Sequence, residues 1–446
     1  MKKLQYTTIA FLVLAVFASC TREEEDLNSE LEAVLELADP VNGKSGFLMP
    51  KSFDFNSIPQ DPNNPITAAK VQLGKFLYHE TGIAQNPMQE EGRGTYSCAT
   101  CHFASAGFQA GRFQGIGDGG SGMANNGLDR NRFQSYSGDI LDVQPIRTPT
   151  AMNAAYQELM LWNGQFGATG MNEGTEYAWT AGTPKENNHL GFQGLETQAI
   201  AGLGVHRLVI NETLINELGY QSMFDAAFPH IPALERYTPV TAGLAIAAYE
   251  RTLLSNQAPF QQFLEGKYNA MSNPEKRGAI LFFGKAQCAS CHTGPALSSM
   301  SFHAIGMGDL DLCPEETFKT NATVVENQGR GGFTGREEDK FAFKTPSLYN
   351  LKDSPFYGHG ASLRTLRDVV VYKNRAVKEN PRVSDVYLSP LFAPLGLSAS
   401  EIDDLTAFLT WSLHDPNLKR YEPDYLLSGQ CFPSNDPQSS EDLGCN

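Results

Sequence analysis

One five-residue pattern occurs twice in this chain, as CATCH at residues 98–102 and as CASCH at residues 288–292. Two cysteines three positions apart, followed directly by histidine, form the attachment signal of a c-type heme. The thiols then bond to the heme edge and the histidine binds the iron. A Cys-x-x-Cys pair alone also suits a redox dithiol or half of a zinc site. The histidines and the repetition favour two covalently bound hemes, held by Cys98, Cys101, His102, Cys288, Cys291 and His292.

The bulk composition is that of a globular protein. The chain has 446 residues, of which 41% are hydrophobic and 19% charged, which is enough for two domains with their own cores. The net charge of −16 argues against nucleic acid as a partner. It suits a small basic electron-transfer protein, and it equally suits general solubility.

The eight cysteines divide between several roles. Four belong to the heme motifs and Cys20 belongs to the export signal described below. Three remain, so at most one disulfide forms within the chain. We expect it between Cys431 and Cys445, which leaves Cys313 as a lone thiol.

The N-terminus has the pattern of a bacterial lipoprotein signal over residues 1–19. Lys2 and Lys3 precede an apolar stretch at residues 9–17 that is too short to span a bilayer, and small residues then precede Cys20. Cys20 is thus expected to carry lipid and anchor the protein to a membrane, with an ordinary secretory signal as the alternative. Both readings predict export to the periplasm or cell envelope, which is also where c-type hemes are attached.

The rest of the sequence indicates a mainly α fold. Residues 20–64 are acidic at first and then rich in proline, which predicts an extended or mobile tether. Helical apolar patterns begin near Ala68 and at Thr241, the second closed by Pro259. Asn273 is expected to cap a third helix, and a capping box at Ser398 opens a fourth.

Long loops and few short strands complete this expectation. Residues 103–136 are rich in glycine and asparagine, and residues 165–193 have the character of a loop insertion. We therefore predict two cytochrome c-like heme domains, at residues 65–265 and 266–420, followed by a polar tail at residues 421–446.

Several further motifs give the chain a resemblance to a known family. In order and rough spacing, the chain resembles the bacterial diheme cytochrome c peroxidase and MauG family over about residues 68–415. Besides the heme motifs, the resemblance rests on residues 148–150 (TPT), 161–164 (LWNG), 195–199 (LETQA), 248–253 (AYERTL), 343–348 (FKTPSL) and 354–357 (SPFY).

The resemblance implies unequal hemes. The N-terminal heme would react with hydrogen peroxide, and the C-terminal heme would be a six-coordinate electron relay. Trp162 matches the tryptophan that lies between the hemes, although it can also be a plain core residue. Peroxidases of the family often carry a blocking histidine after the first motif. Residues 103–188 contain no histidine, so the first iron is expected to be open or water-bound, as in MauG.

The ligand of the second iron is expected from the same resemblance. Tyr357 stands where the peroxidases place a methionine, and MauG uses a tyrosine there. A tyrosinate favours ferric and higher-valent iron and lowers the reduction potential relative to methionine. His359, Met300 and Met307 are the alternative ligands.

The distal pocket of the first heme departs from the family. Gln198 matches the family's glutamine, but Leu208 stands where a glutamate is expected ten residues later. We hypothesise that His206 replaces this acid–base group and that Arg207 assists by stabilising departing charge. His206 can instead bind iron or be an ordinary polar residue. Glu196 and Glu212 are back-up carboxylates.

Calcium is a further cofactor that the family implies, bound between the domains through an asparagine side chain, backbone carbonyls and water. Aligning on Pro149 puts Arg147 at the asparagine position, where its charge would repel a cation. Calcium is therefore left as an open expectation without assigned ligands.

These features together predict a diheme oxidoreductase. Peroxide would react at the first heme, and electrons would pass through the second. The protein would act as a peroxidase fed by a small electron-donor protein, or as a MauG-like oxidase of a partner protein. The alternative is a diheme electron-transfer protein without turnover.

Overall fold

The computed structural model describes residues 25–445. The predicted signal peptide and Cys20 lie outside these residues. Within the described part of the chain, no helix has both the length and the hydropathy needed to cross a bilayer.

The fold is mainly α, as predicted, with two small antiparallel sheets: β1 (Gly120–Ser121) with β2 (Asn131–Arg132), and β3 (Phe302–His303) with β4 (Phe343–Lys344). The longer helices are α2 (Ala68–His79), α3 (Gly194–Val205), α7 (Pro239–Glu250), α9 (Asn273–Phe283), α11 (Leu366–Arg375) and α12 (Ala399–Ala407). The shorter ones are α4 (Glu212–Glu217), α5 (Gln221–Ala227), α6 (Ala233–Arg236), α8 (Pro259–Leu264), α10 (Arg330–Thr334) and α13 (Pro437–Leu443).

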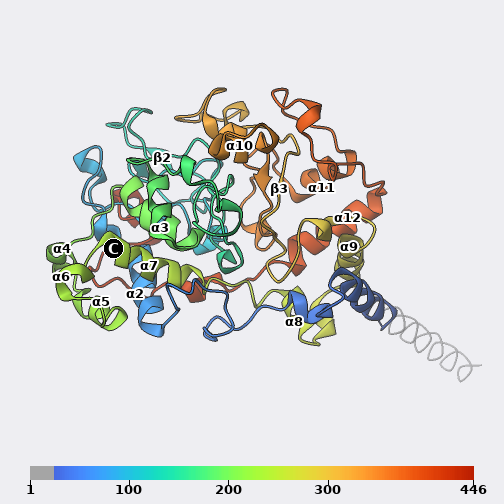
Figure 1. Cartoon of the computed structure of the whole chain (residues 1–446), viewed down its shortest axis with the longest axis horizontal. Coiled ribbons are helices and arrows are strands. Elements are labelled where there is room, and N and C mark those ends of the chain that lie inside the picture. The colour runs from blue at the N-terminus through green and yellow to red at the C-terminus, as the bar shows by residue number, and fades with distance from the viewer. Residues whose placement is uncertain (1–24, 446) are drawn as a thin grey trace, which may run out of the picture.

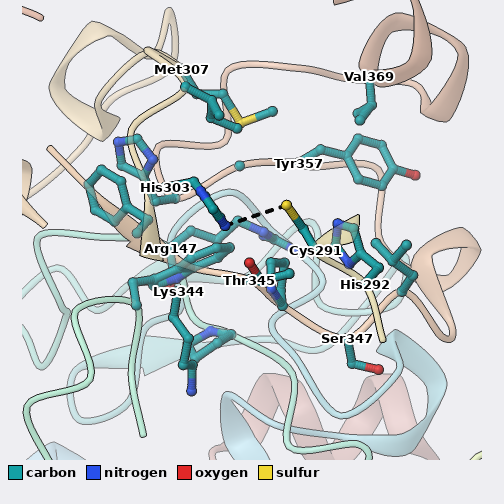
Figure 2. A pocket seen from close by; sticks show the side chains of 18 of the residues that line it. Arg147, Cys291, His292, His303, Met307, Lys344, Thr345, Ser347, Tyr357 and Val369 are labelled. Carbon is teal, nitrogen blue, oxygen red and sulfur yellow. Dashed lines mark hydrogen bonds between the residues drawn. The ribbon is translucent and has the colours of Figure 1, made fainter. Parts of the chain in front are cut away.

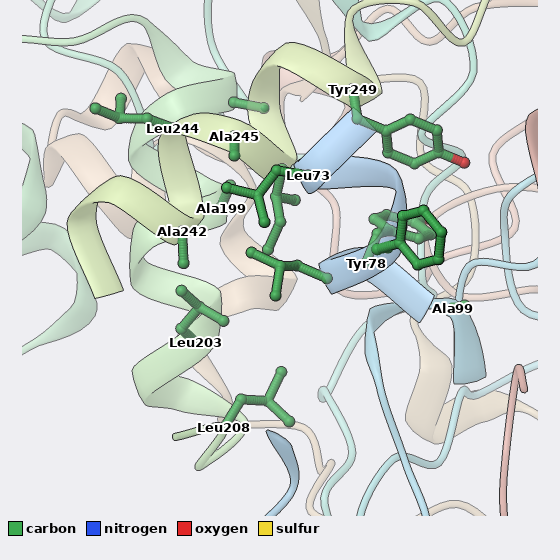
Figure 3. Packing of buried hydrophobic residues seen from close by; sticks show 14 of the residues in the cluster. Leu73, Tyr78, Ala99, Ala199, Leu203, Leu208, Ala242, Leu244, Ala245 and Tyr249 are labelled. Carbon is green, nitrogen blue, oxygen red and sulfur yellow. The ribbon is translucent and has the colours of Figure 1, made fainter. Parts of the chain in front are cut away.

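A first hydrophobic core forms where α2 and α3 pack against α7 (Figure 3). Leu73 of α2, Leu203 of α3 and Ala245 of α7 are all buried in it. A Cβ on Gly74 would lie 1.9 Å from the backbone oxygen of Ala245, so only glycine lets α2 and α7 approach this closely.

A second core forms where α9 packs against α12, with α8 beside them. The ring of Phe408 meets that of Phe260 edge-on and that of Phe282 at a tilt. The close helix approach is repeated here, because a Cβ on Gly278 would lie 2.1 Å from the backbone oxygen of Asp404. The two cores are thus built around the same kind of glycine contact.

The predicted helices are present, with changes at two of their ends. The prediction that Asn273 caps α9 was wrong, because Ser272 occupies the N-cap position and Asn273 is the first residue of the helix. The helix expected from Thr241 to Pro259 stops at Glu250, and Pro259 instead occupies the first turn of α8. Proline is tolerated at this position, because the backbone N–H groups in the first turn of any helix have no partner within the helix. The predicted capping box at Ser398 is confirmed at the start of α12, which continues as a π-helical turn at Phe408–Ser412.

The prediction of an extended or mobile tether was wrong for its first part. Residues 25–38 form a helix, and Leu31 and Leu35 on it are fully buried in the second core. In Figure 1 this helix lies beside α8 and α9. Leu27, Leu31 and Leu35 are spaced four residues apart, so they share one face of a helix. The many acidic residues around them had instead favoured a solvated segment.

The prediction of a polar tail was also wrong for most of its length. Tyr421 and Leu426 pack into the first core, and Asp436 is buried and caps α13. The predicted disulfide between Cys431 and Cys445 is confirmed. The C-terminal segment therefore packs against the first half of the chain, where α13 contacts β1 and Asp442 accepts from the N–H of Met123.

Candidate heme sites

Both heme motifs have the same local backbone. Each begins with a 3-10 turn, Cys98–Thr100 in the first and Cys288–Ser290 in the second. The N–H of each following histidine, His102 or His292, then bonds to the carbonyl of the first cysteine, at 3.1 and 3.0 Å. All four thiols are free and half-buried, so none is committed to a disulfide.

The two motif histidines are oriented in the same way. Nδ1 of His102 lies 3.2 Å from the carbonyl of Phe108, and Nδ1 of His292 lies 2.9 Å from that of Leu297. Burial lowers the pKa of both imidazoles to about 4, so both are neutral at pH 7. An imidazole that donates through Nδ1 presents the lone pair of Nε2, which is the arrangement of a metal-binding histidine.

A cavity of about 240 Å³ opens beside the second motif (Figure 2). Cys291 and His292 line it, together with Trp162, Met307 and Tyr357. Most of its lining is apolar, as in sites for large planar cofactors.

Tyr357 and the three alternative ligands differ in their surroundings. The hydroxyl of Tyr357 donates to the carbonyl of Leu351 at 3.0 Å, and burial raises its pKa to about 12. Nε2 of His359 is engaged with Asp309 at 3.1 Å, and its ring stacks on Phe343 at 3.7 Å.

Of the two methionines, Met307 is buried and lines the same cavity as Tyr357. The sulfur of Met300 lies 3.4 Å from the backbone N–H of Leu159. Of the four candidate ligands, Tyr357 and Met307 thus meet two conditions: they line the cavity, and no other side chain is bonded to them.

A polar cluster lies on the first motif's side. Nδ1 of His206 lies 2.8 Å from Oδ2 of Asp142, and the hydroxyl of Tyr96 donates to the carbonyl of His206 at 2.9 Å. Tyr96 stands two residues before Cys98, so it ties His206 to the first motif. Burial is the main cause of the lowered pKa of His102, and the charge of His206 adds to it.

Arg207 and Gln198 belong to the same region. The guanidinium of Arg207 donates to Asp118 at 2.9 Å. The backbone of Arg207 itself is left-handed, with φ of 57°. Such a conformation is strained for a non-glycine residue and concentrates at functional sites. The side-chain oxygen of Gln198 on α3 is buried and has no hydrogen-bond partner among the described residues. A buried acceptor of this kind is costly unless something else binds it.

The surroundings of Glu196 and Glu212, the two alternative carboxylates, do not suit an acid–base role at the first heme. Glu196 forms a fully buried ion pair with Arg251 at 2.6 Å, and Glu212 is exposed at the start of α4. Of the acid–base groups predicted from the sequence for this pocket, His206 is therefore the one with a carboxylate partner beside the first motif.

Comparison with known proteins identifies the family of the chain. The family model described as di-haem cytochrome c peroxidase matches residues 68–269. The methylamine utilization protein MauG of Methylorubrum extorquens is 30% identical over 356 residues, which cover 79% of this chain and 80% of MauG. The chain belongs to the diheme cytochrome c peroxidase and MauG family. Within it, cytochrome-c peroxidase IdrP1 of Denitromonas iodatirespirans is 27% identical, with 79% of this chain and 83% of IdrP1 covered.

Solved structures show the same fold. A MauG-like protein associated with microbial copper homeostasis superposes with a TM-score of 0.59 at 24% identity, covering 83% of this chain and 95% of that one. As a member of this family, the protein is a diheme oxidoreductase of the peroxidase or MauG type.

The cavity beside the second motif suits a heme because of its charge as well as its size. Lys344 is buried there, bonded only to the Gln157 amide oxygen and the Leu159 carbonyl, and burial lowers its pKa to about 7. Lys373 lines the same cavity, and burial lowers its pKa to about 8. No carboxylate of the described chain pairs with either lysine. Heme carries two carboxylates, so it would supply the missing negative charge.

Sequence reasoning missed the two aspartates that hold His206 and Arg207. Asp142 lies 64 positions before His206 and Asp118 lies 89 positions before Arg207, in loops without a regular pattern. It also missed Glu250, whose pKa is raised to about 8 by burial near Cys98. No local signal in the sequence connects these residues to the heme motifs.

Proposed function

We propose that hydrogen peroxide is reduced at the heme held by His102, and that the heme held by His292 relays the electrons. The observation that carries this proposal is an asymmetry between two otherwise matched sites. The histidines share one orientation, but a cluster of His206, Arg207 and Asp142 accompanies only the first. The second site is an apolar cavity that Tyr357 borders.

Covalent attachment through the four motif cysteines is part of the proposal. When bound, heme supplies an iron that takes up peroxide and accepts electrons. The net reaction cleaves the O–O bond of hydrogen peroxide with two protons and two electrons and releases two waters. The chain's own residues must then place the peroxide and move its protons.

His206 is proposed as the group that moves protons at the first site. A neutral imidazole takes a proton from one peroxide oxygen and returns it to the oxygen that leaves. Asp142 holds Nδ1, so Nε2 is the atom that exchanges the proton. Arg207 stabilises the departing negative charge, and the free amide oxygen of Gln198 accepts a hydrogen bond from peroxide or water.

Tyr357 is proposed as the second iron's distal ligand. Its surroundings support this over His359, which would first have to leave Asp309 and the Phe343 ring. Because the pKa of the phenol is raised, the phenol would lose its proton only when a cation such as the heme iron binds its oxygen. The nearby Arg147 charge favours the anion.

Trp162 is proposed as the bridge between the two sites. It lines the second cavity, and its indole N–H bonds to the carbonyl of Arg147, a residue that also contacts the loop after the first motif. The electrons come from a small electron-donor protein, or from a partner protein that is itself oxidised. Export and a lipid anchor at Cys20 would place this reaction in the periplasm or at the cell envelope.

Steady-state turnover tests the proposal. The purified protein should contain two covalent hemes and should consume hydrogen peroxide in the presence of a reduced small c-type cytochrome, two cytochromes oxidised per peroxide. A two-heme protein that exchanges electrons with the cytochrome but leaves peroxide intact would instead be an electron carrier.

A further inference from the structure

Arg147 lies buried between the segments that form the two heme sites. Its side chain is 2% exposed. One guanidinium nitrogen donates to Oε1 of Gln109 at 2.7 Å and to Oγ of Ser354 at 2.8 Å, and the other donates to the carbonyl of Arg112 at 3.1 Å. Gln109 and Arg112 follow the first heme motif, whereas Ser354 begins the segment that leads to Tyr357.

The backbone of Arg147 makes two more connections. Its N–H donates to the carbonyl of His359 at 2.8 Å, and its carbonyl accepts from the indole of Trp162 at 2.8 Å. Arg147 therefore links the first heme loop, the second heme cavity and the proposed bridging residue.

The guanidinium is held by neutral oxygens alone. An amide oxygen, a hydroxyl and a backbone carbonyl accept its hydrogen bonds, and no carboxylate of residues 25–445 pairs with it. Burial lowers its pKa to about 9, so it remains mostly charged at pH 7. The titratable groups around it are the Tyr357 phenol, whose anion would raise this pKa, and Arg364, which lowers it.

Neutral oxygens of this kind are also what calcium binds. The family implies a calcium ion between the heme domains, and the residues here do not fit one. A dication would have to enter beside a buried guanidinium that already uses the oxygens, and the energetic cost of two adjacent buried cations is high. Among residues 25–445 there is also no group of three His, Cys, Asp or Glu side chains placed so as to hold a metal ion.

We infer that Arg147 takes the place of the calcium ion, so that this protein keeps its two heme sites and Trp162 in fixed relative positions without calcium. The positive charge is supplied by the chain itself and cannot be removed by a chelator. This inference does not depend on which heme reacts with peroxide, and it concerns Arg147 as a positioning residue.

The wild-type holoprotein provides the first test. Its thermal unfolding midpoint and its optical spectrum should be unchanged by a chelator or by millimolar calcium, and elemental analysis should find no stoichiometric calcium. One calcium per chain, or a chelator-induced fall in the midpoint, would overturn the inference.

Arg147→Asn provides the second test, because it removes the charge and leaves the oxygens. Its holoprotein should unfold at a midpoint lower by roughly 5 °C or more, and calcium should restore most of that loss. Calorimetry should show one calcium bound by the variant and none by the wild type. If calcium neither binds nor stabilises Arg147→Asn, these oxygens are not a cation site and the inference fails.

Two control variants separate charge from packing. Arg147→Lys keeps the charge and should stay insensitive to calcium. Arg364→Asn removes a neighbouring guanidinium that lies over the same Phe356 ring but pairs with Glu315. Calcium should not stabilise Arg364→Asn, and a calcium response equal to that of Arg147→Asn would count against a specific site. Should Arg147→Asn fail to fold, the wild-type and Arg147→Lys measurements still decide the question.

Discussion

The indole Nε1 of Trp162 donates a 2.8 Å hydrogen bond to the backbone carbonyl of Arg147. A carbonyl accepts this bond but does not take the proton at neutral pH. If an electron leaves this indole, as proposed, the N–H has no base to which it can pass its proton, and the electron can return without a proton transfer. The ring of His359 meets the indole edge-on at 6.4 Å and helps to fix its orientation.

Replacing Trp162 with phenylalanine should separate the two hemes kinetically. The reaction of peroxide at the first heme should remain, whereas the spectral change at the second heme should slow by roughly tenfold or more, because the oxidisable indole is gone. Stopped-flow spectroscopy resolves the two changes. The control is Trp179→Phe, a buried tryptophan that packs on His189. Equal rates in Trp162→Phe and the wild type would exclude Trp162 as the bridge.

His206→Gln should slow the reaction with peroxide by about 100-fold, the usual loss when an acid–base group is removed. His189→Gln is the matched control and should react at the wild-type rate, since His189 bonds to the carbonyl of Trp179. A His206→Gln protein that reacts as fast as the wild type would show that another group moves the proton.

The pH profile of this reaction should report the pairing of His206 with Asp142. Burial lowers the pKa of His206, but the Asp142 carboxylate more than offsets this and the net pKa lies above 6.5, while Arg207 opposes the rise. The proposed base is the neutral imidazole, so the rate should rise with pH and reach half its maximum above pH 6.5. Asp142→Asn should move this midpoint to lower pH. A midpoint unaffected by Asp142→Asn would argue against His206 as the titrating group.

Tyr357→Met should raise the reduction potential of the second heme, by on the order of 100 mV, because a thioether stabilises ferrous iron better than a phenolate does. Spectroelectrochemical titration measures the two hemes separately. His359→Gln serves as the comparison and should leave the second heme's ligand-dependent bands in place. A shift in His359→Gln with none in Tyr357→Met would assign the ligand to His359.

Gly278→Ala should destabilise the second core by about 1–3 kcal/mol, since its methyl group would meet the backbone oxygen of Asp404 at 2.1 Å. Gly204→Ala is the matched control in α3, where an added Cβ meets nothing within 4 Å. That change should be neutral or slightly stabilising. Denaturant-induced unfolding compares the two, and similar midpoints for both variants would contradict the close approach of α9 and α12.

The sequence predicted what depends on local patterns. The heme motifs, the helix at α2 and the capping box at Ser398 each have a signature within a few residues. The helix at residues 25–38 was missed because its acidic residues outweighed three leucines, whose burial depends on a core formed by residues far along the chain.

The candidate site was predictable only in part, for the same physical reason. His206 was proposed from its position relative to Gln198, but its partner Asp142 comes from an irregular loop. The C-terminal segment was expected to be a polar tail, yet Thr100 of the first heme motif bonds to the carbonyl of Pro433 at 2.6 Å. Contacts between distant irregular segments leave no periodic trace in a sequence.

A first heme that is open to peroxide and electronically connected to the second should pass oxidising equivalents to it. Addition of one equivalent of hydrogen peroxide to the resting ferric holoprotein, followed by optical absorption and reductive titration, tests it most directly. The bands of both hemes should change, and two electrons should restore the resting spectrum. Two low-spin hemes whose spectra are indifferent to peroxide would contradict it.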